Sequence, residues 1–219
     1  MAGYEYVFWD WNGTLMDDVY VALASVNDIL ARRGRAPIDL ERYYSLMATP
    51  ITLFYERLFA PEKPDFPALS REFHEGYDRH LPEHGLAVGA RETLEAIARA
   101  GIRQALVSSS EAGRLVRQVR ALGIDGLFEN VAGQDDFSAG SKLCSVRRHI
   151  ALAGVAPEKA LMLGDLEHDA EVAHDLGCGC LLYSGGHQSR RVLEALGAPV
   201  IDRIPDALHY IMGRETCLR

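Results

Sequence analysis

The chain has 219 residues, of which 48% are hydrophobic and 25% are charged, and its formal net charge is −8. These values predict a globular protein with one domain, or with one domain that carries an insertion. An acidic chain without a basic cluster disfavours a general nucleic-acid or anionic-membrane partner. Its apolar runs are shorter than the roughly 18 residues that a membrane helix needs.

Two further features concern the cellular compartment. The first residues show no basic and apolar leader of the kind that directs export. The cysteines have no CxxC spacing, so we expect reduced thiols at Cys144, Cys178, Cys180 and Cys217. Both features predict a cytoplasmic protein.

Short apolar runs that fit buried strands recur along the chain, and helical patterns that end near glycine lie between most of them. The runs cover residues 4–9, 103–107, 127–131, 160–163, 180–183 and 200–201. This alternation predicts an α/β fold with a doubly wound, Rossmann-like parallel sheet. Ligands of such sheets bind outside the carboxyl ends of the strands.

The segment 17–84 interrupts the alternation. It holds no convincing strand and carries helical patterns at 19–30, 51–58 and 69–81. We predict an inserted helical domain at 17–84 and a core domain formed by residues 1–16 and 85–219. The hinges should lie near Met16 and between Glu83 and Gly89, and Asp17 or Asp18 is the expected N-cap of the first inserted helix.

The first strand ends in Asp10-Trp11-Asn12-Gly13-Thr14. This order places a carboxylate at the carboxyl edge of the sheet, directly before a glycine-containing turn. A nucleophile or a metal ligand fits that place. Simple capping of the turn by Asp10 is the alternative.

The second strand ends in Ser108-Ser109-Ser110, before a helix expected from Glu111 onward. Hydroxyl groups and free backbone amides at a helix N-terminus suit an anion. N-capping by one serine is the alternative.

Lys142 follows Ala139-Gly140-Ser141 at the start of another expected helix. A helix N-terminus carries positive partial charge and favours acids, so a lysine there calls for an anionic partner. A phosphate or a carboxylate would explain the placement better than a solvated surface position.

A further buried strand ends in Gly164-Asp165, and Asp169 follows four residues later. Several acidic groups near strand ends would repel one another without a cation. Carboxylate and carbonyl oxygens with water are the ligands that magnesium prefers, so we expect Mg²⁺ here. The alternative is a capping Asp165 and a solvent-facing Asp169.

In order and spacing, these four motifs resemble the signature of the haloacid dehalogenase superfamily, whose members are mostly magnesium-dependent phosphatases. The resemblance covers nearly the whole chain and is phosphoglycolate-phosphatase-like in architecture, with residues 17–84 as the helical cap domain. It implies that Asp10 is the nucleophile that forms an aspartyl-phosphate. Lys142, Ser108 and Ser109 would bind the phosphate, with Thr14 beside them steadying the turn.

The resemblance also implies the metal ligands. Mg²⁺ would bind the carboxylates of Asp10 and Asp165 and the backbone carbonyl of Asn12, while Asp169 would orient Lys142 or a metal-bound water. The expected substrate is a small phosphate ester or anhydride of a metabolite. Thr49-Pro50 corresponds to the substrate-specificity loop of the cap, or is an ordinary helix start.

Position 12 departs from the family pattern, because most relatives that cleave alkyl esters have an aspartate there as acid and base. Asn12 cannot transfer that proton, and the loss of such a group usually costs about 10²- to 10⁴-fold in rate. We therefore expect slow turnover of alkyl esters, and expect that Asn12→Asp raises it. The runner-up function is a catalytically weak or inactive phosphate-metabolite binding protein.

Other groups could replace the missing acid. Histidine is suited to proton transfer near neutral pH, and the candidates are Glu167, His168, His74, His80 and His84. Two related activities need no acid at position 12. The phosphonatase type requires a cap lysine, and Lys63 is the only lysine in the insert. The dehalogenase type lacks the metal aspartate, which Asp165 argues against.

Overall fold

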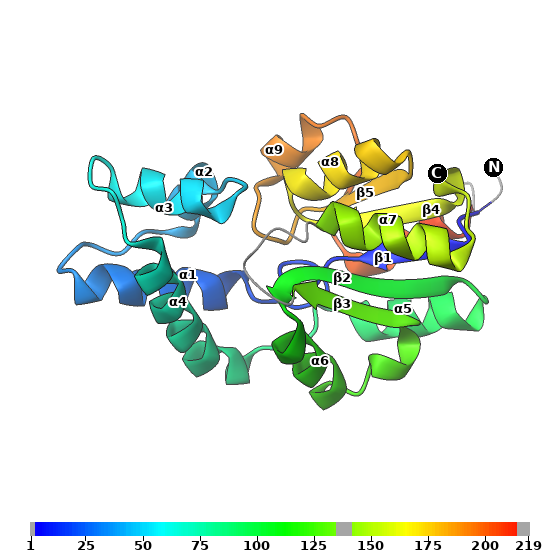
Figure 1. The fold of residues 1–219 in the computed structure, drawn as a ribbon, viewed down its shortest axis with the longest axis horizontal. Helices are drawn as coiled ribbons and strands as arrows, with labels where there is room; N and C mark the ends of the chain where they lie inside the picture. Colours follow the sequence, from blue (N-terminus) through cyan, green and yellow to red (C-terminus); the bar gives the residue numbers. More distant parts are fainter. Residues whose placement is uncertain (1–2, 135–141, 214–219) are drawn as a thin grey trace.

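A parallel sheet of six strands forms the centre of the core in the computed structural model, which describes residues 3–134 and 142–213. The strands lie in the order β3-β2-β1-β4-β5-β6, and helices cover both faces (Figure 1). The predicted doubly wound α/β fold is therefore confirmed. The strands are β1 (Tyr6–Trp9), β2 (Arg103–Glu111), β3 (Asn130–Gln134), β4 (Ala160–Gly164), β5 (Gly179–Tyr183) and β6 (Val200–Ile201).

The largest differences from the predicted strand boundaries lie in β2 and β3. β2 continues through Glu111, so the serines lie inside the strand, and the helix begins only at Ala112. β3 begins at Asn130 because residues 125–127 form a 3₁₀ turn before it. β2 extends into polar serines, whereas the apolar pair Leu127-Phe128 precedes β3, so the apolar pattern marked neither boundary.

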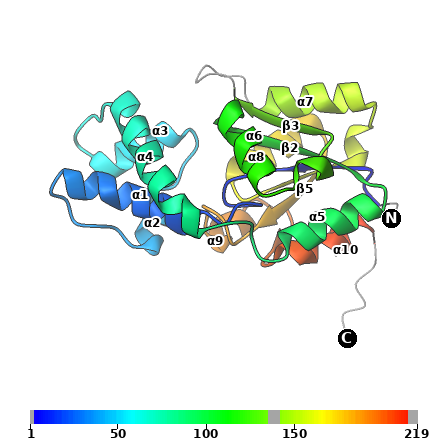
Figure 2. The ribbon, with the colours of Figure 1, turned by 90° about the horizontal axis from the view of Figure 1, so that it is seen from below.

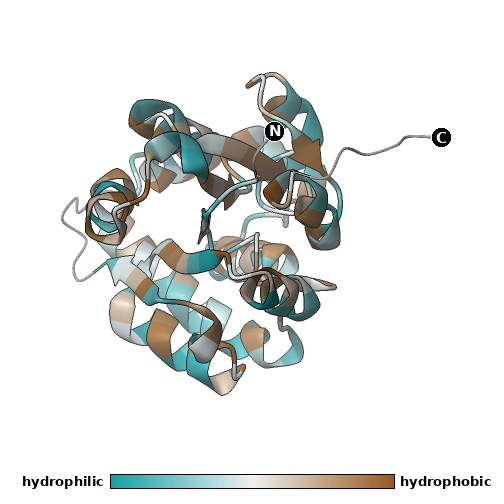
Figure 3. Ribbon diagram, turned by 90° about the vertical axis from the view of Figure 1, so that its right-hand side faces the viewer, coloured by the Kyte–Doolittle hydropathy of each residue, from teal (hydrophilic) through white to brown (hydrophobic). Residues whose placement is uncertain are grey.

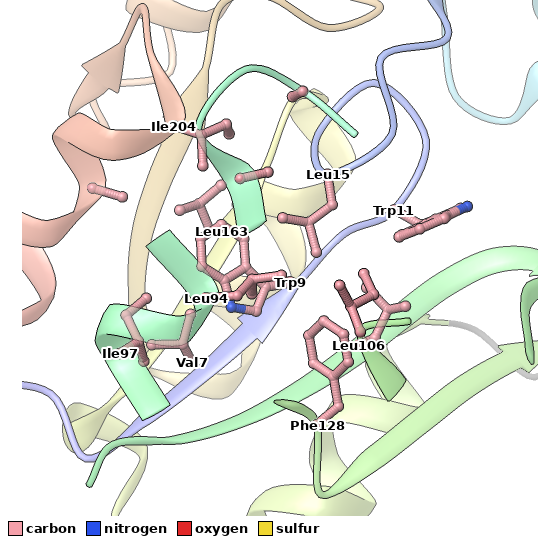
Figure 4. Packing of buried hydrophobic residues seen from close by; sticks show 14 of the residues in the cluster. Val7, Trp9, Trp11, Leu15, Leu94, Ile97, Leu106, Phe128, Leu163 and Ile204 are labelled. Atoms are coloured by element: carbon pink, nitrogen blue, oxygen red, sulfur yellow. The ribbon is translucent and has the colours of Figure 1, made fainter. Parts of the chain in front are cut away.

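The side chains of β1 alternate between the two faces of the sheet, and all of them are buried. Val7 and Trp9 pack with residues of α5 (Ala90–Arg99), α6 (Ala112–Ala121) and α10 (Ala207–Ile211) (Figure 4). On the opposite face, Tyr6 and Phe8 pack with residues of α7 (Lys142–Ala153) and α8 (Glu167–Leu176). This packing fixes β1 between its neighbours and determines where its carboxyl end lies.

The helical insert forms a body beside the sheet (Figure 1). Its helices are α1 (Val19–Arg32), α2 (Leu40–Leu46), α3 (Ile51–Phe59) and α4 (Phe66–His80). They share a hydrophobic cluster that is separate from the two clusters of the sheet. α2 was not among the predicted helices. The separate cluster supports the proposed division into a cap at 17–84 and a core.

The chain leaves the core and returns to it at one point. Met16 and Leu86 form an antiparallel bridge. The amide of Asp17 donates to the Gly85 carbonyl at 2.9 Å, and the amide of Ala87 donates to the Leu15 carbonyl at 2.9 Å. The two connections of the insert are thus hydrogen-bonded to each other, near the predicted hinges.

Helices complete the two outer layers. α5 and α10 lie side by side on one face of the sheet, and α9 (Arg190–Glu194) follows β5 (Figure 2). The helices carry both hydrophobic and hydrophilic segments (Figure 3). Among the residues that the structure describes, no helix has the length and apolar character needed to cross a membrane. Cys217 and Ala139-Gly140-Ser141 lie outside the described residues.

The separate cap cluster generates a prediction about stability. Phe54 is 1% exposed within that cluster, so Phe54→Ala should lower the free energy of unfolding by about 3–5 kcal/mol. Hydrogen exchange should become faster in α1–α4 and stay unchanged in β1, β2 and β4. Leu53→Ala, on the same helix but 36% exposed, is the control. Equal acceleration in cap and sheet would contradict the proposed division.

Candidate active site

Three buried carboxylates gather at the carboxyl end of the sheet. Asp10 follows β1, Asp165 follows β4, and Asp169 lies in the first turn of α8. One carboxylate oxygen from each lies within 4.8 Å of the others. β1 and β4 are parallel neighbours, with Trp9 opposite Leu163, so the residues that follow these strands emerge side by side.

Lys142 is the cation of this group. It is the first described residue of α7 and is 5% exposed. Its Nζ donates to Asp10 Oδ1 and, at 2.7 Å, to Asp169 Oδ1. Burial alone would lower the pKa of Lys142, but the two carboxylates outweigh burial and raise it, so the ammonium stays charged. The expectation of an anionic partner for this lysine is met by carboxylates.

Asp169 is held from two sides. Its Oδ1 accepts from Lys142, while its Oδ2 accepts from the backbone amides of Asp165 and Leu166 at 3.1 and 3.0 Å. The carboxylate therefore caps the start of α8 and orients the lysine at the same time. It is not the solvent-facing residue of the alternative interpretation, since it is 0% exposed.

Asp165, like Asp169, is 0% exposed. Its Oδ1 accepts from Thr14 Oγ1 at 2.9 Å, and its Oδ2 accepts from the backbone amide of His187 at 2.6 Å. Burial raises its pKa well above the ordinary value, and although the charge of His187 lowers it, Asp10 and Asp169 raise it further. An acid in this environment is destabilised as an anion unless a cation lies nearby.

The residues present fit a divalent cation. Burial also raises the pKa of Asp10, which Lys142 lowers and Asp169 raises again. Three carboxylates thus face one lysine ammonium in a buried space, so negative charge is left unbalanced among them. Oxygen-only donors of this kind suit a hard cation such as Mg²⁺.

Asn12 lies beside this group, and its side chain is engaged on both sides. Oδ1 accepts from Ser110 Oγ at 2.6 Å. Nδ2 donates to Asp18 Oδ2 at 2.6 Å and to the Tyr77 hydroxyl at 3.0 Å. The amide thereby joins the end of β1 to β2 and to cap helix α4.

Asp18 is the N-cap residue of α1, one of the two predicted alternatives. Its side chain, however, makes no capping hydrogen bond. Instead, Oδ1 accepts from the Gly13 amide at 2.6 Å and Oδ2 accepts from the Tyr77 hydroxyl at 2.6 Å. Burial would raise the pKa of Asp18, but His187, Tyr77 and Asn12 outweigh it and lower the pKa. The short loop after β1 offers this carboxylate closer donors than the helix does.

His187 is a site residue that sequence reasoning missed. It follows Gly185 and Gly186 in the loop after β5, is 8% exposed, and has Nε2 at 3.3 Å from Asp18 Oδ1. Its Nδ1 lies 3.0 Å from the hydroxyl of Tyr43, which belongs to the unpredicted helix α2. The available signal was a Gly-Gly-His run that begins two residues after the end of β5, at the carboxyl edge of the sheet.

The serine run has a different geometry from the predicted one. Ser108 is buried and its Oγ accepts from the Ser110 amide at 3.0 Å, whereas Ser109 is exposed. The N-terminus of α6 is capped by Glu111, whose carboxylate accepts from the amides of Gly113 and Arg114. The expectation of free amides at this helix start was therefore wrong. Phosphate binding by Ser108 and Ser109 stays a prediction.

Three of the alternative proton donors make contacts of their own. His74 Nδ1 bonds to a carbonyl of its own helix, and His80 Nε2 lies 2.9 Å from Asp28 Oδ2. His168 Nδ1 lies 3.3 Å from Glu171 Oε2. Among the described histidines, His187 is the one that contacts the acids beside the Asp10 loop, through its side chain to Asp18 and its amide to Asp165.

Lys63 and Thr49-Pro50, the two cap features considered in the sequence, do not belong to the group of buried acids. Lys63 lines a cap pocket of about 90 Å³ with Arg33 and Phe59, and none of the three site acids lines that pocket. Thr49 and Pro50 are exposed at the start of α3. This position of Lys63 argues further against the phosphonatase type.

Comparison with known proteins assigns the family. Residues 7–183 match the family model described as haloacid dehalogenase-like hydrolase. The chain therefore belongs to the haloacid dehalogenase-like hydrolase family.

Curated relatives match over most of their length. A phosphoglycolate phosphatase of Mesorhizobium japonicum is 28% identical over 214 residues, which cover 92% of this chain and 92% of the relative. Phosphoglycolate phosphatase 1 of Pseudomonas aeruginosa is 26% identical, with 92% and 78% covered.

Solved structures share the fold. A haloacid dehalogenase-like hydrolase of Streptococcus pneumoniae aligns with a TM-score of 0.82 at 17% identity, covering 94% of this chain and 98% of that one. CbbY of Rhodobacter sphaeroides, solved in complex with xylulose-1,5-bisphosphate, aligns with a TM-score of 0.73 at 23% identity, covering 93% and 96%.

The ion pair between His187 and Asp18 generates a pH prediction. Burial lowers the pKa of His187, but Asp18 and the other acids outweigh burial and raise it from 6.5 to about 9. Protonated His187 therefore stabilises the folded state. Its contribution to the free energy of unfolding is fully present below pH 6.5 and is lost as the pH rises through about 9. Urea unfolding of metal-free protein should show His187→Gln less stable than wild type at neutral pH, with the difference shrinking above about pH 9.

His74→Gln is the matched control, because His74 contacts a carbonyl of its own helix. A His187→Gln difference that stays constant from neutral to alkaline pH would contradict the ion pair.

Proposed function

We propose that this protein is a magnesium-dependent phosphatase that cleaves a small phosphate ester or anhydride through Asp10. The observation that carries the proposal is the position of Asp10, which is buried at the end of β1, paired with Lys142 and grouped with Asp165 and Asp169. A carboxylate nucleophile divides one difficult displacement into two easier ones. The names of the relatives as phosphoglycolate phosphatases agree with this chemistry.

The metal ligands are part of the proposal. Asp10, Asp165 and the backbone carbonyl of Asn12 would hold Mg²⁺, with Asp169 nearby to orient Lys142 or a bound water. When bound, the ion would balance charge on the transferring phosphoryl group. The excess of negative charge among the three acids supports a cation at this place.

In the first step, a carboxylate oxygen of Asp10 forms a bond to phosphorus as the bond to the leaving oxygen breaks. The leaving group departs with that electron pair, and an aspartyl-phosphate remains on Asp10. Water then attacks this phosphorus, which releases inorganic phosphate and restores the carboxylate. Lys142, Ser108 and Ser109 would balance the charge of the phosphoryl oxygens, as donors in a buried site do effectively.

Asn12 favours substrates whose leaving group needs no proton. The pKa of a departing carboxylate is far below that of an alkoxide, so an acyl phosphate or another anhydride can react without a general acid. The amide of Asn12 is also held by Ser110, Asp18 and Tyr77. We therefore propose acyl or aryl phosphates as the faster class and alkyl esters as the slower one.

The same residue supports the second candidate, a catalytically weak or inactive protein that binds a phosphorylated metabolite. Magnesium and phosphate affinity would persist in it, because the backbone carbonyl of residue 12 does not depend on the side chain. In either function the cap at 17–84 would cover the site and exclude water. A cytoplasmic location and the absence of nucleic-acid and membrane partners belong to the same proposal.

Activity measurements separate the two candidates. With Mg²⁺, wild type should release phosphate from acetyl phosphate and from para-nitrophenyl phosphate, and Asp10→Ala should reduce the rate by at least about 10³-fold. Asp17→Asn, an exposed neighbour of the site, is the control. A wild-type rate no higher than that of Asp10→Ala would leave the binding function.

Metal binding gives a prediction that does not need turnover. Adding Mg²⁺ to chelator-treated protein should raise the melting temperature, because a ligand that binds only the folded state stabilises it. Asp165→Asn should remove most of this shift, since it takes away one buried carboxylate. Equal shifts in wild type, Asp165→Asn and the exposed control Asp17→Asn would exclude the proposed site.

A further inference from the structure

The side chain of Asn12 is held in one orientation by its neighbours. Nδ2 faces the carboxylate oxygen of Asp18, which can only accept, at 2.6 Å. Oδ1 accepts from the Ser110 hydroxyl at 2.6 Å. Exchanging the amide nitrogen and oxygen would bring two acceptors together at Asp18, so the geometry selects this orientation.

Asp18 has no remaining capacity for a substrate proton. Oδ1 accepts from Gly13 and lies 3.3 Å from the imidazole of His187, and Oδ2 accepts from Asn12 and Tyr77. A carboxylate offers about four lone-pair sites. Four donors around a residue that is 1% exposed occupy all of them. Asp18 is therefore suited to holding its neighbours and unsuited to replacing the missing acid.

A carboxylate at position 12 would meet Asp18 directly. The oxygen replacing Nδ2 would face Asp18 Oδ2 at the present distance of 2.6 Å. Two carboxylate oxygens so close would face each other as acceptors with no donor between them, and one of the side chains would turn away. An aspartate at position 12 and an aspartate at position 18 are thus incompatible in this geometry.

We infer that Asp18 is a positioning residue that fixes Asn12 as an amide, so that a proton-transferring carboxyl at position 12 requires removal of the Asp18 charge. This inference rests on the proposed function. It replaces the expectation from the sequence that Asn12→Asp alone raises the turnover of alkyl esters: the charge of Asp18 has to be removed as well. The two positions act as one hydrogen-bonded unit with a single negative charge.

The unit also includes the cap. Tyr77 belongs to α4 and bonds to both Asp18 and Asn12, while Asp18 precedes α1. Asp18 in turn holds the amide of Gly13, which has a φ of +72°. The loop that carries Asp10 is therefore positioned through Asp18 by residues of the cap.

The test compares Asn12→Asp, Asp18→Asn and the double variant. In the double variant an asparagine nitrogen at position 18 again donates to an oxygen at position 12, so the pair is restored with reversed polarity. The readout is the kcat ratio of an alkyl phosphate, glycerol 3-phosphate, to para-nitrophenyl phosphate. A purely structural role would change both rates together and leave this ratio unchanged.

We expect Asn12→Asp alone to change the ratio by less than about threefold, and the double variant to raise it by about 10²-fold, the lower end of general-acid catalysis. Asn12→Asp/Asp18→Ala, which removes the charge without adding a donor, should also raise the ratio. Asn12→Asp/Asp17→Asn, which changes the exposed neighbour, should behave as Asn12→Asp. An equal rise in Asn12→Asp alone, or no rise in either Asp18 double variant, would overturn the inference.

Melting temperatures of wild type, Asn12→Asp, Asp18→Asn and Asn12→Asp/Asp18→Asn give an independent readout. Each single variant should be destabilised, and the double variant should be more stable than the sum of the two single effects predicts. Additive effects would overturn the pairing. If no variant exceeds Asp10→Ala in phosphate release, the proposed function fails, and this melting cycle still decides whether the two residues form one unit.

Discussion

The ammonium of Lys142 lies buried between two carboxylates, and the arrangement of the site depends on that contact. Asp10 follows the central strand and Asp169 lies in the first turn of α8, so one lysine ties α7 to both. Removing one partner from such a buried pair typically costs about 3–5 kcal/mol, because the remaining charge is left uncompensated. The positions of α7 and α8 on the same face of the sheet therefore follow from electrostatics as well as from apolar packing.

A second charged group lies on the cap side of the Asp10 loop. Asp18 and His187 form an ion pair whose hydrogen bonds reach cap residues Tyr43 and Tyr77. The first group holds the nucleophile against the sheet, and the second links the same loop to two cap helices. The proposed nucleophile Asp10 thus lies between two buried ionic networks, at Lys142 and at Asp18.

The sequence was sufficient to predict the fold and to place the candidate site residues that directly follow strands. Buried strands are continuous apolar runs, so β1, β2 and β4 were recognisable, and Asp10 and Asp165 were placed by the strands they follow. Helix α2 has only seven residues, too few for a clear period. Asp18 has the local sequence of an N-cap, and only its contact with Gly13 shows its actual role. Predicting His187 as a site residue would have required knowing which loop returns to Asp165.

The bridge between Met16 and Leu86 has a consequence for how this architecture can vary. Both ends of the insert are joined by hydrogen bonds within the core, so its interior can be lengthened, shortened or exchanged while the ends stay in register. A different helical module could replace the insert at this pair of connections without disturbing the sheet. An exchanged module would preserve the contact with the Asp10 loop only if it again placed a hydroxyl beside Asp18, as Tyr77 does here.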